Sequence, residues 1–479
     1  MQKKGQGTYN VVVIGAGTAG LVTAAGTASL GGRVALIERN KMGGDCLNFG
    51  CVPSKALISS ARLIEQIRQS EKLGLRKQEP QFEFAEVMQH MRERRAKIEP
   101  NDSQERFESL GVDVFRGEAK FKSPHELEVD GRRLHGRTFV IATGSRAAIP
   151  RIEGLNSVTY FTNETVFDQL HDIPASMIVL GGGPIGCELG QAFARLGVRV
   201  TIVQSAAQLL PAEDANVAAF LHQRLTSEGI DIRLNGRAHR VCQENGEIML
   251  DLGYKTITAA AMLVAAGRTP NLRALDLEAA GVEYDERGVK VNEFLQTSQR
   301  HIYAAGDVTH HPKFTHTADF TARIVVRNIL MPVSLLRQKV NWSIVPWCTF
   351  TDPEIAHVGL NEKKARNAGI KYDVFRVELE HVDRAVVESE DGFAKILTRK
   401  GSDEILGVTI VGPHAGDLLH EFVVAMHAHL GLAKLASIIH IYPTLAELAR
   451  KAGDQYNKTR LTPRAKVLFA WLYRRARRG

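Results

Sequence analysis

The stretch VVVIGAGTAG, residues 11–20, decides the fold of the N-terminal part of the chain. It is an apolar strand pattern that runs into a glycine-rich turn and then a helix, and the apolar run VALIE, residues 34–38, follows it. Gly15 permits the tight turn, Gly17 lets the backbone approach a pyrophosphate, and Gly20 allows close packing of helix on strand. Glu38 ends the second strand, where a carboxylate accepts hydrogen bonds from an adenosine ribose. The pattern predicts a dinucleotide-binding βαβ unit rather than a turn needed only for packing.

The same theme returns in IVLGGGPIGCE, residues 178–188, followed by VTIVQ, residues 200–204. Gly181, Gly183 and Gly186 take the three glycine positions, so a second dinucleotide is predicted here. The second strand now ends in Gln204. A carboxylate there favours NAD and arginines favour NADP. Gln204 supplies neither, and the nicotinamide preference stays open.

Between the two units lies GGDCLNFGCVPSK, residues 43–55, with Cys46 and Cys51 five positions apart. A disulfide needs Cα atoms within about 7 Å, and four intervening residues that include Gly50 allow the chain to fold back that far. A helix N-terminus and a nearby cation lower a thiol pKa. The other interpretations are a structural disulfide and half of a zinc site, but no second Cys/His cluster of ligand spacing accompanies the pair. We predict a redox-active pair and no metal site.

Length, charge and cysteine count limit the function classes. The 479 residues, 44% hydrophobic and 24% charged, are typical of a globular protein of two to four domains. The net charge of +8 comes from residues 450–479, whose own balance is +9, and no nucleic-acid-binding motif lies beside them, so we expect no nucleic-acid partner. The other three cysteines are predicted to be buried small residues: Cys187, Cys242 and Cys348. Because the first ten residues are polar and no apolar run approaches the ~18–20 residues of a membrane span, a cytoplasmic location is expected.

The pattern predicts an α/β fold with two Rossmann-like dinucleotide-binding domains and a C-terminal α+β domain. Composition shifts suggest the domain limits. The expected segments are a first dinucleotide-binding segment at 1–150, a second dinucleotide-binding domain at 151–272, a return to the first domain at 273–339, an α+β domain at 340–455, and a basic helix or tail at 456–479.

In this order the motifs resemble the class I pyridine nucleotide-disulfide oxidoreductases, the family of dihydrolipoamide dehydrogenase, glutathione reductase and mercuric reductase. The resemblance runs from about residue 9 to 455. The segment around Cys46 and Cys51 is similar to the family's active-site signature, and three other motifs match in family order: ATG at 142–144, AAGRTPN at 265–271 and IYAAGDV at 302–308. The resemblance implies FAD and NAD(P)H as cofactors, and a C-terminal domain that forms a homodimer whose active sites are completed by the neighbouring subunit. It also implies five further cofactor-binding residues: Gly44, Thr143, Gly144, Gly267 and Asp307. Of these, Asp307 is the partner of the ribityl chain.

The resemblance also implies roles for individual side chains. Cys51 is the thiol next to the flavin, and Cys46 is the outer thiol that attacks the substrate. Lys55 lies by flavin N5, which makes it a cofactor-binding residue as well, and it is paired with Glu188. The plainer interpretation of Lys55 and Glu188 is a solvated charge and a carboxylate at a helix start.

The acid/base motif departs from the family pattern. A His-Pro with a Glu five residues after the His is expected, but this chain has Tyr442 before the proline, Glu447 five positions later, and His440 two positions earlier. A phenol of pKa near 10 is a poor general base. His440 either substitutes for it or is an ordinary interface histidine. A tyrosine here is similar to mercuric reductase, yet the last cysteine is Cys348, so the C-terminal cysteine pair of those enzymes is missing.

The function expected from the sequence is therefore an FAD-dependent NAD(P)H:disulfide oxidoreductase with an unidentified acceptor, either a small-molecule or protein disulfide or another electrophile. One alternative is dihydrolipoamide dehydrogenase. Another is a redox-responsive flavoprotein scaffold held at a membrane or an acidic partner by its basic tail. Residues 461–479 begin with a helix-start proline and mix Val467, Leu468, Trp471 and Leu472 with arginines, so peripheral membrane contact and a solvated helix are both open.

Overall fold

The structure is a computed structural model that describes residues 7–331 and 333–477. The first six residues of the polar N-terminus, and Arg478 and Gly479 of the basic segment, lie outside the described residues. The chain divides into two compact units, each described here by itself. Unit 1 comprises Met1–Ile64, Gln81–Ala207 and Glu228–Asn341, and unit 2 comprises Glu65–Pro80, Gln208–Ser227 and Trp342–Gly479. The finer domain limits expected from the sequence stay predictions.

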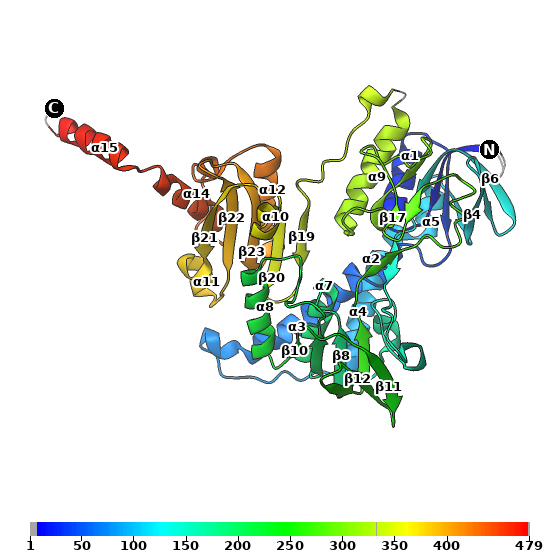
Figure 1. Cartoon of the computed structure of the whole chain (residues 1–479), viewed down its shortest axis with the longest axis horizontal. Helices are drawn as coiled ribbons and strands as arrows, with labels where there is room; N and C mark the ends of the chain where they lie inside the picture. Colours follow the sequence, from blue (N-terminus) through cyan, green and yellow to red (C-terminus); the bar gives the residue numbers. More distant parts are fainter. Residues whose placement is uncertain (1–6, 332, 478–479) are drawn as a thin grey trace. The chain divides into compact units, whose positions relative to one another are not determined.

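The first sheet of unit 1 carries the first glycine-rich motif (Figure 1). Its strand order is β3-β2-β1-β6-β5-β4, with β18 paired to β6, and β1 lies parallel to β2 and β6. Residues 11–14 are buried on both faces, which is why this strand reads as an unbroken apolar run. The strands are β1 (Thr8–Ile14), β2 (Val34–Glu38), β3 (Asp113–Arg116), β4 (Ala119–Ser123), β5 (Glu126–Val129), β6 (Arg132–Ile141) and β18 (Ile302–Ala304).

The helices of unit 1 lie between the strands of the first sheet in the chain, except α9, which follows them. Helix α1 connects β1 to β2 and packs against α9, which begins far along the chain at Thr315. The two cysteines lie on α2 and at the start of α3, whose last turn belongs to unit 2. These helices are α1 (Thr18–Ser29), α2 (Gly44–Asn48), α3 (Cys51–Arg68), α4 (Phe84–Ile98), α5 (Gln104–Ser109) and α9 (Thr315–Leu330).

The second sheet of unit 1 carries the second glycine-rich motif. Its strands lie parallel in the order β10-β9-β8-β14, and α7 (Pro184–Arg195) connects β8 to β9. An antiparallel sheet β11-β12-β13 lies nearby in sequence, and β7 pairs with β15. The strands are β7 (Ser145–Ala147), β8 (Ser176–Leu180), β9 (Arg199–Val203), β10 (Asp231–Arg233), β11 (Arg240–Glu244), β12 (Glu247–Asp251), β13 (Thr256–Ala259), β14 (Ala261–Val264) and β15 (Arg268–Pro270).

Unit 2 is built on an antiparallel sheet in the order β19-β20-β23-β22-β21. Helix α12 packs on β20 and β23, and α14 packs on β21, so that one apolar core lies between sheet and helices. These elements are α8 (Ala215–Ser227), β19 (Pro346–Thr349), β20 (Glu354–Gly359), α10 (Glu362–Asn367), β21 (Tyr372–Glu378), α11 (Asp383–Val387), β22 (Phe393–Arg399), β23 (Ile405–Gly412), α12 (Ala415–His427), α13 (Leu432–Leu435) and α14 (Glu447–Thr459). The two Rossmann-like sheets of unit 1 and the α+β arrangement of unit 2 confirm the predicted fold class.

The described chain ends in α15 (Pro463–Ala476), drawn in red in Figure 1. Pro463 occupies the first turn, and the Thr462 hydroxyl accepts a hydrogen bond from the Ala465 amide at 3.2 Å. Both features start a helix, because proline lacks the amide hydrogen that the first turn leaves unpaired and the hydroxyl satisfies another. Among the residues that the structure describes, no helix has the length and apolar character needed to cross a membrane.

The prediction for the remaining cysteines was right for Cys187 and wrong for the other two. Cys187 is buried on α7. Cys242 lies on β11 and Cys348 on β19, and both side chains are only partly buried. Each strand is at the edge of its sheet, so its neighbours cover it on one side only.

Candidate active site

The turn that carries the cysteines lies against the first glycine-rich turn. The Gly43 amide donates to the Ala16 carbonyl at 2.9 Å, and a Cβ on Gly44 would lie 2.6 Å from the Gly17 Cα. Only glycine at position 44 allows the two backbones to touch in this way. A Cβ on Gly50 would lie 2.9 Å from a carboxylate oxygen and 3.1 Å from the carbonyl oxygen of Asp45, so that glycine suits the close fold-back between the cysteines.

The thiols of Cys46 and Cys51 are hydrogen-bonded to each other, and both are in the free form. The Cys51 sulfur also lies 3.1 Å from the hydroxyl oxygen of Thr315 at the start of α9. The hydrogen bond from Cys46 lowers the pKa of Cys51 to about 6, helped by Thr315 and the charge of Lys55 and opposed by burial. The same hydrogen bond, together with burial, raises the pKa of Cys46. In the reduced pair, Cys51 is therefore the thiolate and Cys46 keeps its proton.

Lys55 and Glu188 form the ion pair that the resemblance implies. The Lys55 ammonium on α3 lies 2.8 Å from a carboxylate oxygen of Glu188 on α7, and the Glu188 side chain is 7% exposed. The pair joins the helix that begins at Cys51 to the helix of the second glycine-rich motif. Lys55 thus brings its positive charge to the Cys51 thiolate while it neutralises a buried carboxylate.

The two glycine-rich turns have matching geometry. A Cβ on Gly20 would lie 1.8 Å from the carbonyl oxygen of Gly15, and a Cβ on Gly186 would lie 1.8 Å from that of Gly181. At the end of β2, the two carboxylate oxygens of Glu38 accept from the Ala16 and Asn40 amides at 2.7 and 2.6 Å. The corresponding end of β9 carries Gln204.

Gln204 makes comparable backbone contacts through a single atom. Its side-chain amide oxygen accepts from the Gly182 amide at 3.5 Å and from the Ser205 amide at 3.1 Å. The two sites therefore share their backbone contacts and differ in charge.

A polar cluster holds the remaining sequence-predicted residues of unit 1. Asn271 donates from its side chain to the Thr143 carbonyl at 2.9 Å and from its amide to the Gly144 carbonyl at 2.9 Å. Asp307 accepts a hydrogen bond from Ser145 at 2.7 Å. Gly267 has φ of +125° and precedes Arg268, in a conformation that side-chain-bearing residues rarely adopt.

The acid/base candidates belong to unit 2, and each has its own partner there. One ring nitrogen of His440 lies 2.8 Å from Glu421, and the other lies 3.0 Å from the Ile438 carbonyl. The Tyr442 hydroxyl donates to Asp383 at 2.8 Å, and this bond raises the pKa of Tyr442. Glu447 pairs with Arg450 at 2.6 Å. The structure thus directs the hydrogen bonds of Tyr442 and Glu447 to different partners and places an acceptor oxygen beside each ring nitrogen of His440.

Comparison with known families identifies the chain. Residues 9–322 match the family model described as pyridine nucleotide-disulphide oxidoreductase. The chain belongs to the pyridine nucleotide-disulphide oxidoreductase family. Residues 345–452 match the dimerisation domain of the same family. The resemblance inferred from the sequence is confirmed, and the chain is a flavoprotein oxidoreductase of a family that uses FAD and NAD(P)H.

Relatives within the family have different names. Mercuric reductase from Staphylococcus aureus is 33% identical over 459 residues, which cover 94% of this chain and 83% of that protein. Dihydrolipoyl dehydrogenase from Geobacillus stearothermophilus is 33% identical over 456 residues, covering 92% and 95%. Among solved structures, the Cu(II) complex of the HOCl-induced flavoprotein disulfide reductase RclA from Escherichia coli has a TM-score of 0.85 and 27% identity, covering 94% of this chain and all of that one.

The residues present fit the two dinucleotide cofactors of this family. Helices α1 and α7 begin at Gly17 and Gly183 without a side-chain cap, so their first amides are available to a phosphate. A Cβ on Gly17 would meet only the Gly44 Cα, at 3.8 Å, and a Cβ on Gly183 would meet nothing within 4 Å. Open space at these two glycines, beside tightly packed ones, suits a close approach of pyrophosphate to the backbone.

The structure adds site residues that the sequence reasoning missed. Thr315 has no local signal, because only the packing of α9 brings it to Cys51. Arg268 and Asp45 lie within the motifs at 265–271 and 43–55, but the sequence predicted no role for either side chain. The Arg268 guanidinium lies 3.1 Å from Asp45 and 3.7 Å from Asp307, and it links the cysteine turn to the IYAAGDV motif at 302–308. Burial raises the pKa of Asp45, and Arg268 opposes the rise.

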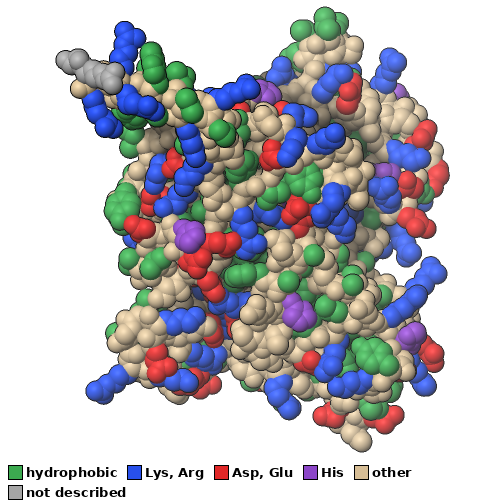
Figure 2. All heavy atoms as spheres, turned by 60° about the vertical axis from the view of Figure 1, so that its left-hand side comes forward, with side chains coloured by type: hydrophobic (Ala, Val, Ile, Leu, Met, Phe, Trp, Pro, Cys, Tyr) green, Lys and Arg blue, Asp and Glu red, His purple; other side chains and the backbone are tan. Residues whose placement is uncertain are grey.

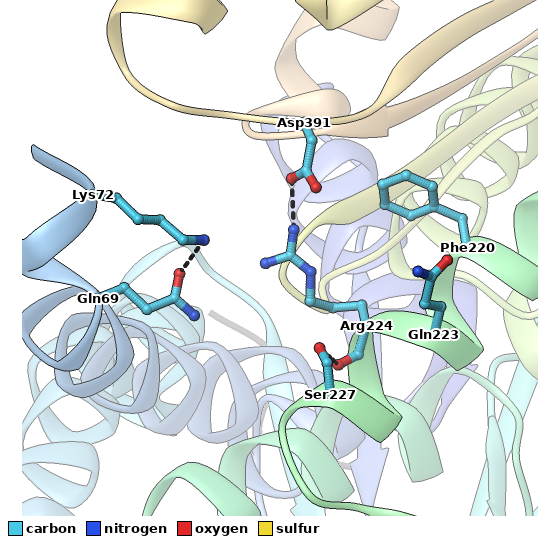
Figure 3. A pocket seen from close by; sticks show the side chains of 7 residues that line it. All are labelled: Gln69, Lys72, Phe220, Gln223, Arg224, Ser227 and Asp391. Atoms are coloured by element: carbon cyan, nitrogen blue, oxygen red, sulfur yellow. Dashed lines mark hydrogen bonds and ion pairs between the residues drawn. The ribbon is translucent and has the colours of Figure 1, made fainter.

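Unit 2 also has a surface recess of about 400 Å³ (Figure 3). Its charged groups already face partners within it: Arg224 lies 2.6 Å from Asp391, and Lys72 donates to Gln69 at 2.7 Å. None of the residues predicted to be functional lines it. The lining residues are Gln69, Lys72, Phe220, Gln223, Arg224, Ser227 and Asp391.

Proposed function

We propose that the chain is an NAD(P)H-dependent flavoprotein reductase that works as a homodimer and passes electrons from its Cys46–Cys51 pair to a small thiol-binding metal ion such as Cu(II) or Hg(II). The observation that carries this proposal is the state of the acid/base candidates. His440 is committed at both ring nitrogens, and Tyr442 is bound to Asp383 with a raised pKa. Both candidates are thus hydrogen-bonded to groups of unit 2 rather than to a thiol.

A metal acceptor suits two thiols whose acid/base candidates are hydrogen-bonded to other groups. Reduction of an organic disulfide releases a thiolate that leaves faster when it is protonated or has a low pKa. A metal ion instead binds sulfur, the ligand type that soft ions prefer. Cys46 and Cys51 then form a disulfide, the one proton held by Cys46 goes to water, and two electrons reduce one Hg(II) to Hg(0) or two Cu(II) to Cu(I).

The cofactor contacts proposed here combine the two glycine-rich turns with the roles that the family resemblance implies. Glu38 would hold the adenosine ribose of FAD, Asp307 its ribityl chain, and the glycine-rich turn at 181–186 the nicotinamide dinucleotide. FAD, when bound, carries the electron pair from the nicotinamide to the disulfide. Lys55 and Thr315 stabilise the Cys51 thiolate, and Cys46 holds the remaining proton until the acceptor takes the sulfur.

The homodimer is supported by the match to the dimerisation domain and by apolar exposure in unit 2. Ile439 is 98% exposed and Ile441 is 79% exposed, on the same loop as His440. Adjacent large apolar side chains left in water mark an interaction surface. The names of relatives support the acceptor class, since one is a mercuric reductase and a solved relative is a Cu(II) complex.

The test is steady-state oxidation of NADH and NADPH by the FAD-loaded protein with Cu(II), Hg(II), lipoamide and glutathione disulfide as acceptors. We expect kcat/KM for a metal ion to exceed that for either disulfide by at least an order of magnitude, and Cys46→Ser to abolish the difference. Tyr442→Phe is the matched control and should leave metal reduction unchanged. A faster reaction with lipoamide, slowed by Tyr442→Phe, would identify a dihydrolipoamide dehydrogenase and refute the proposal.

A further inference from the structure

The C-terminal helix α15 lies beyond the residues that match the family. The dimerisation domain match ends at residue 452, and α15 runs from Pro463 to Ala476. None of its described residues is buried. Figure 2 shows green apolar and blue basic side chains gathered next to the grey C-terminal residues at the upper left. A helix with exposed apolar side chains needs a partner for them.

One side of α15 is apolar and free of charge. At about 100° per residue, positions 465, 468, 469, 472 and 476 fall on one face, with the spacing i, i+3, i+4, i+7 and i+11. We call this the apolar face: Ala465, Leu468, Phe469, Leu472 and Ala476. Leu468, Phe469 and Leu472 are 54%, 46% and 45% exposed. Val467 and Trp471 were grouped with Leu468 and Leu472 on the sequence alone. The side that includes Val467 and Trp471 also carries arginines.

The opposite side of α15 is basic. Arg474 and Arg477 lie nearest its centre, Lys466 lies toward the edge next to Tyr473, and Arg464 and Arg475 lie toward the other edge, next to Leu468. The Arg475 guanidinium lies 5.7 Å from the centre of the Trp471 ring, which keeps the indole with this basic side. The sequence has no Asp or Glu after Asp454, so nothing acidic on the helix offsets these charges. An apolar face opposite a side whose charges are all positive complements a surface that is anionic outside and apolar beneath.

We propose that α15 binds the surface of an anionic phospholipid membrane, with the apolar face in the acyl region and the basic side at the headgroups. Fourteen helical residues measure about 21 Å, too short for a bilayer core of about 30 Å, so the helix lies in the plane of the interface. Tyr473 lies at one border of the apolar face, the depth that aromatic side chains with a polar end prefer. This surface is separate from the thiol chemistry and delivers the reductase to a membrane.

The test is co-sedimentation of the FAD-loaded full-length protein with vesicles of phosphatidylcholine alone and of phosphatidylcholine with phosphatidylglycerol. Binding is expected to the anionic vesicles and to weaken with salt. Lys466→Gln with Arg474→Gln should weaken it by about 25-fold, since each basic residue strengthens binding about fivefold. Leu468→Gln with Leu472→Gln should weaken it by about two orders of magnitude, because two side chains no longer enter the acyl region.

The matched control is Val467→Gln with Ala470→Gln, two apolar-to-polar changes on the basic side, which should bind as the unchanged protein does. Equal flavin content and NAD(P)H oxidation in all variants show that each is folded, and they do not depend on the proposal. Unchanged binding of the Leu468/Leu472 variant, or binding to double-stranded DNA as tight as to anionic vesicles, would overturn the membrane assignment. Loss of the dimer in that variant with vesicle binding retained would instead assign the face to a second copy.

Discussion

Replacement of Thr315 by valine tests how the protein keeps Cys51 as a thiolate. The hydroxyl lies 3.1 Å from the sulfur, and valine keeps the shape of the side chain but not the donor. A hydrogen bond to a charged group contributes about 1.5–3 kcal/mol, and one pKa unit corresponds to about 1.4 kcal/mol, so the pKa of Cys51 should rise by about one to two units. Starting from a pKa of about 6, the thiolate fraction at pH 7 falls from about nine-tenths to between about a half and a tenth.

The assay is a pH titration of the ultraviolet absorbance of the thiolate in the fully reduced protein. Thr315→Ser is the control, because it keeps the hydroxyl and should titrate close to the unchanged protein. The rate of alkylation of Cys51, located by peptide mass spectrometry, should follow the same curve. A valine variant that titrates with the unchanged protein, or a serine variant that shifts as far as valine, would refute the role given to the hydroxyl.

Three other predictions follow from the site and from unit 2. Lys55→Gln removes the cation that faces buried Glu188. Since Lys55 is itself about a third exposed, we expect the free energy of unfolding, measured in urea titrations, to fall by about 1–2 kcal/mol. Lys55→Arg should retain most of that stability, and an unchanged midpoint for Lys55→Gln would contradict the pairing. Gln204→Glu places a carboxylate where Glu38 lies in the first motif, so the KM for NADPH should rise by about tenfold or more while that for NADH does not; equal changes for both would argue against this site for the ribose. Burial lowers the pKa of His357 to about 4, so between pH 6.5 and 4 the unfolded state binds a proton that the folded state does not, and stability should fall by up to about 3 kcal/mol as the pH is lowered. His357→Gln should lose that part of the pH dependence in urea unfolding, and an unchanged slope would show that another group causes it.

The predictable parts of the site are those in which a short segment fixes its own geometry. Gly15 and Gly20 touch within a single turn, and so do Gly181 and Gly186, so their spacing alone was enough to place both dinucleotide sites. Cys46 and Cys51 meet because Gly50 lets a few residues fold back. The apolar face of the C-terminal segment was harder to predict, because the charge-free face of α15 is defined only once the helix and its bounds are known.

The sequence alone predicted the fold class and the family, and it singled out Cys46 and Cys51 as a candidate redox pair, because each of these is recognised from local spacing. Tertiary packing decided the chemical state of that pair: α9 brings Thr315 to Cys51 from a position 264 residues away, and α7 brings Glu188 to Lys55 from 133 residues away. It also decided that His440 and Tyr442 are committed to Glu421 and Asp383. The pKa of a thiol and the availability of a base depend on what lies within a few ångströms, and a linear sequence does not state which distant residues those are.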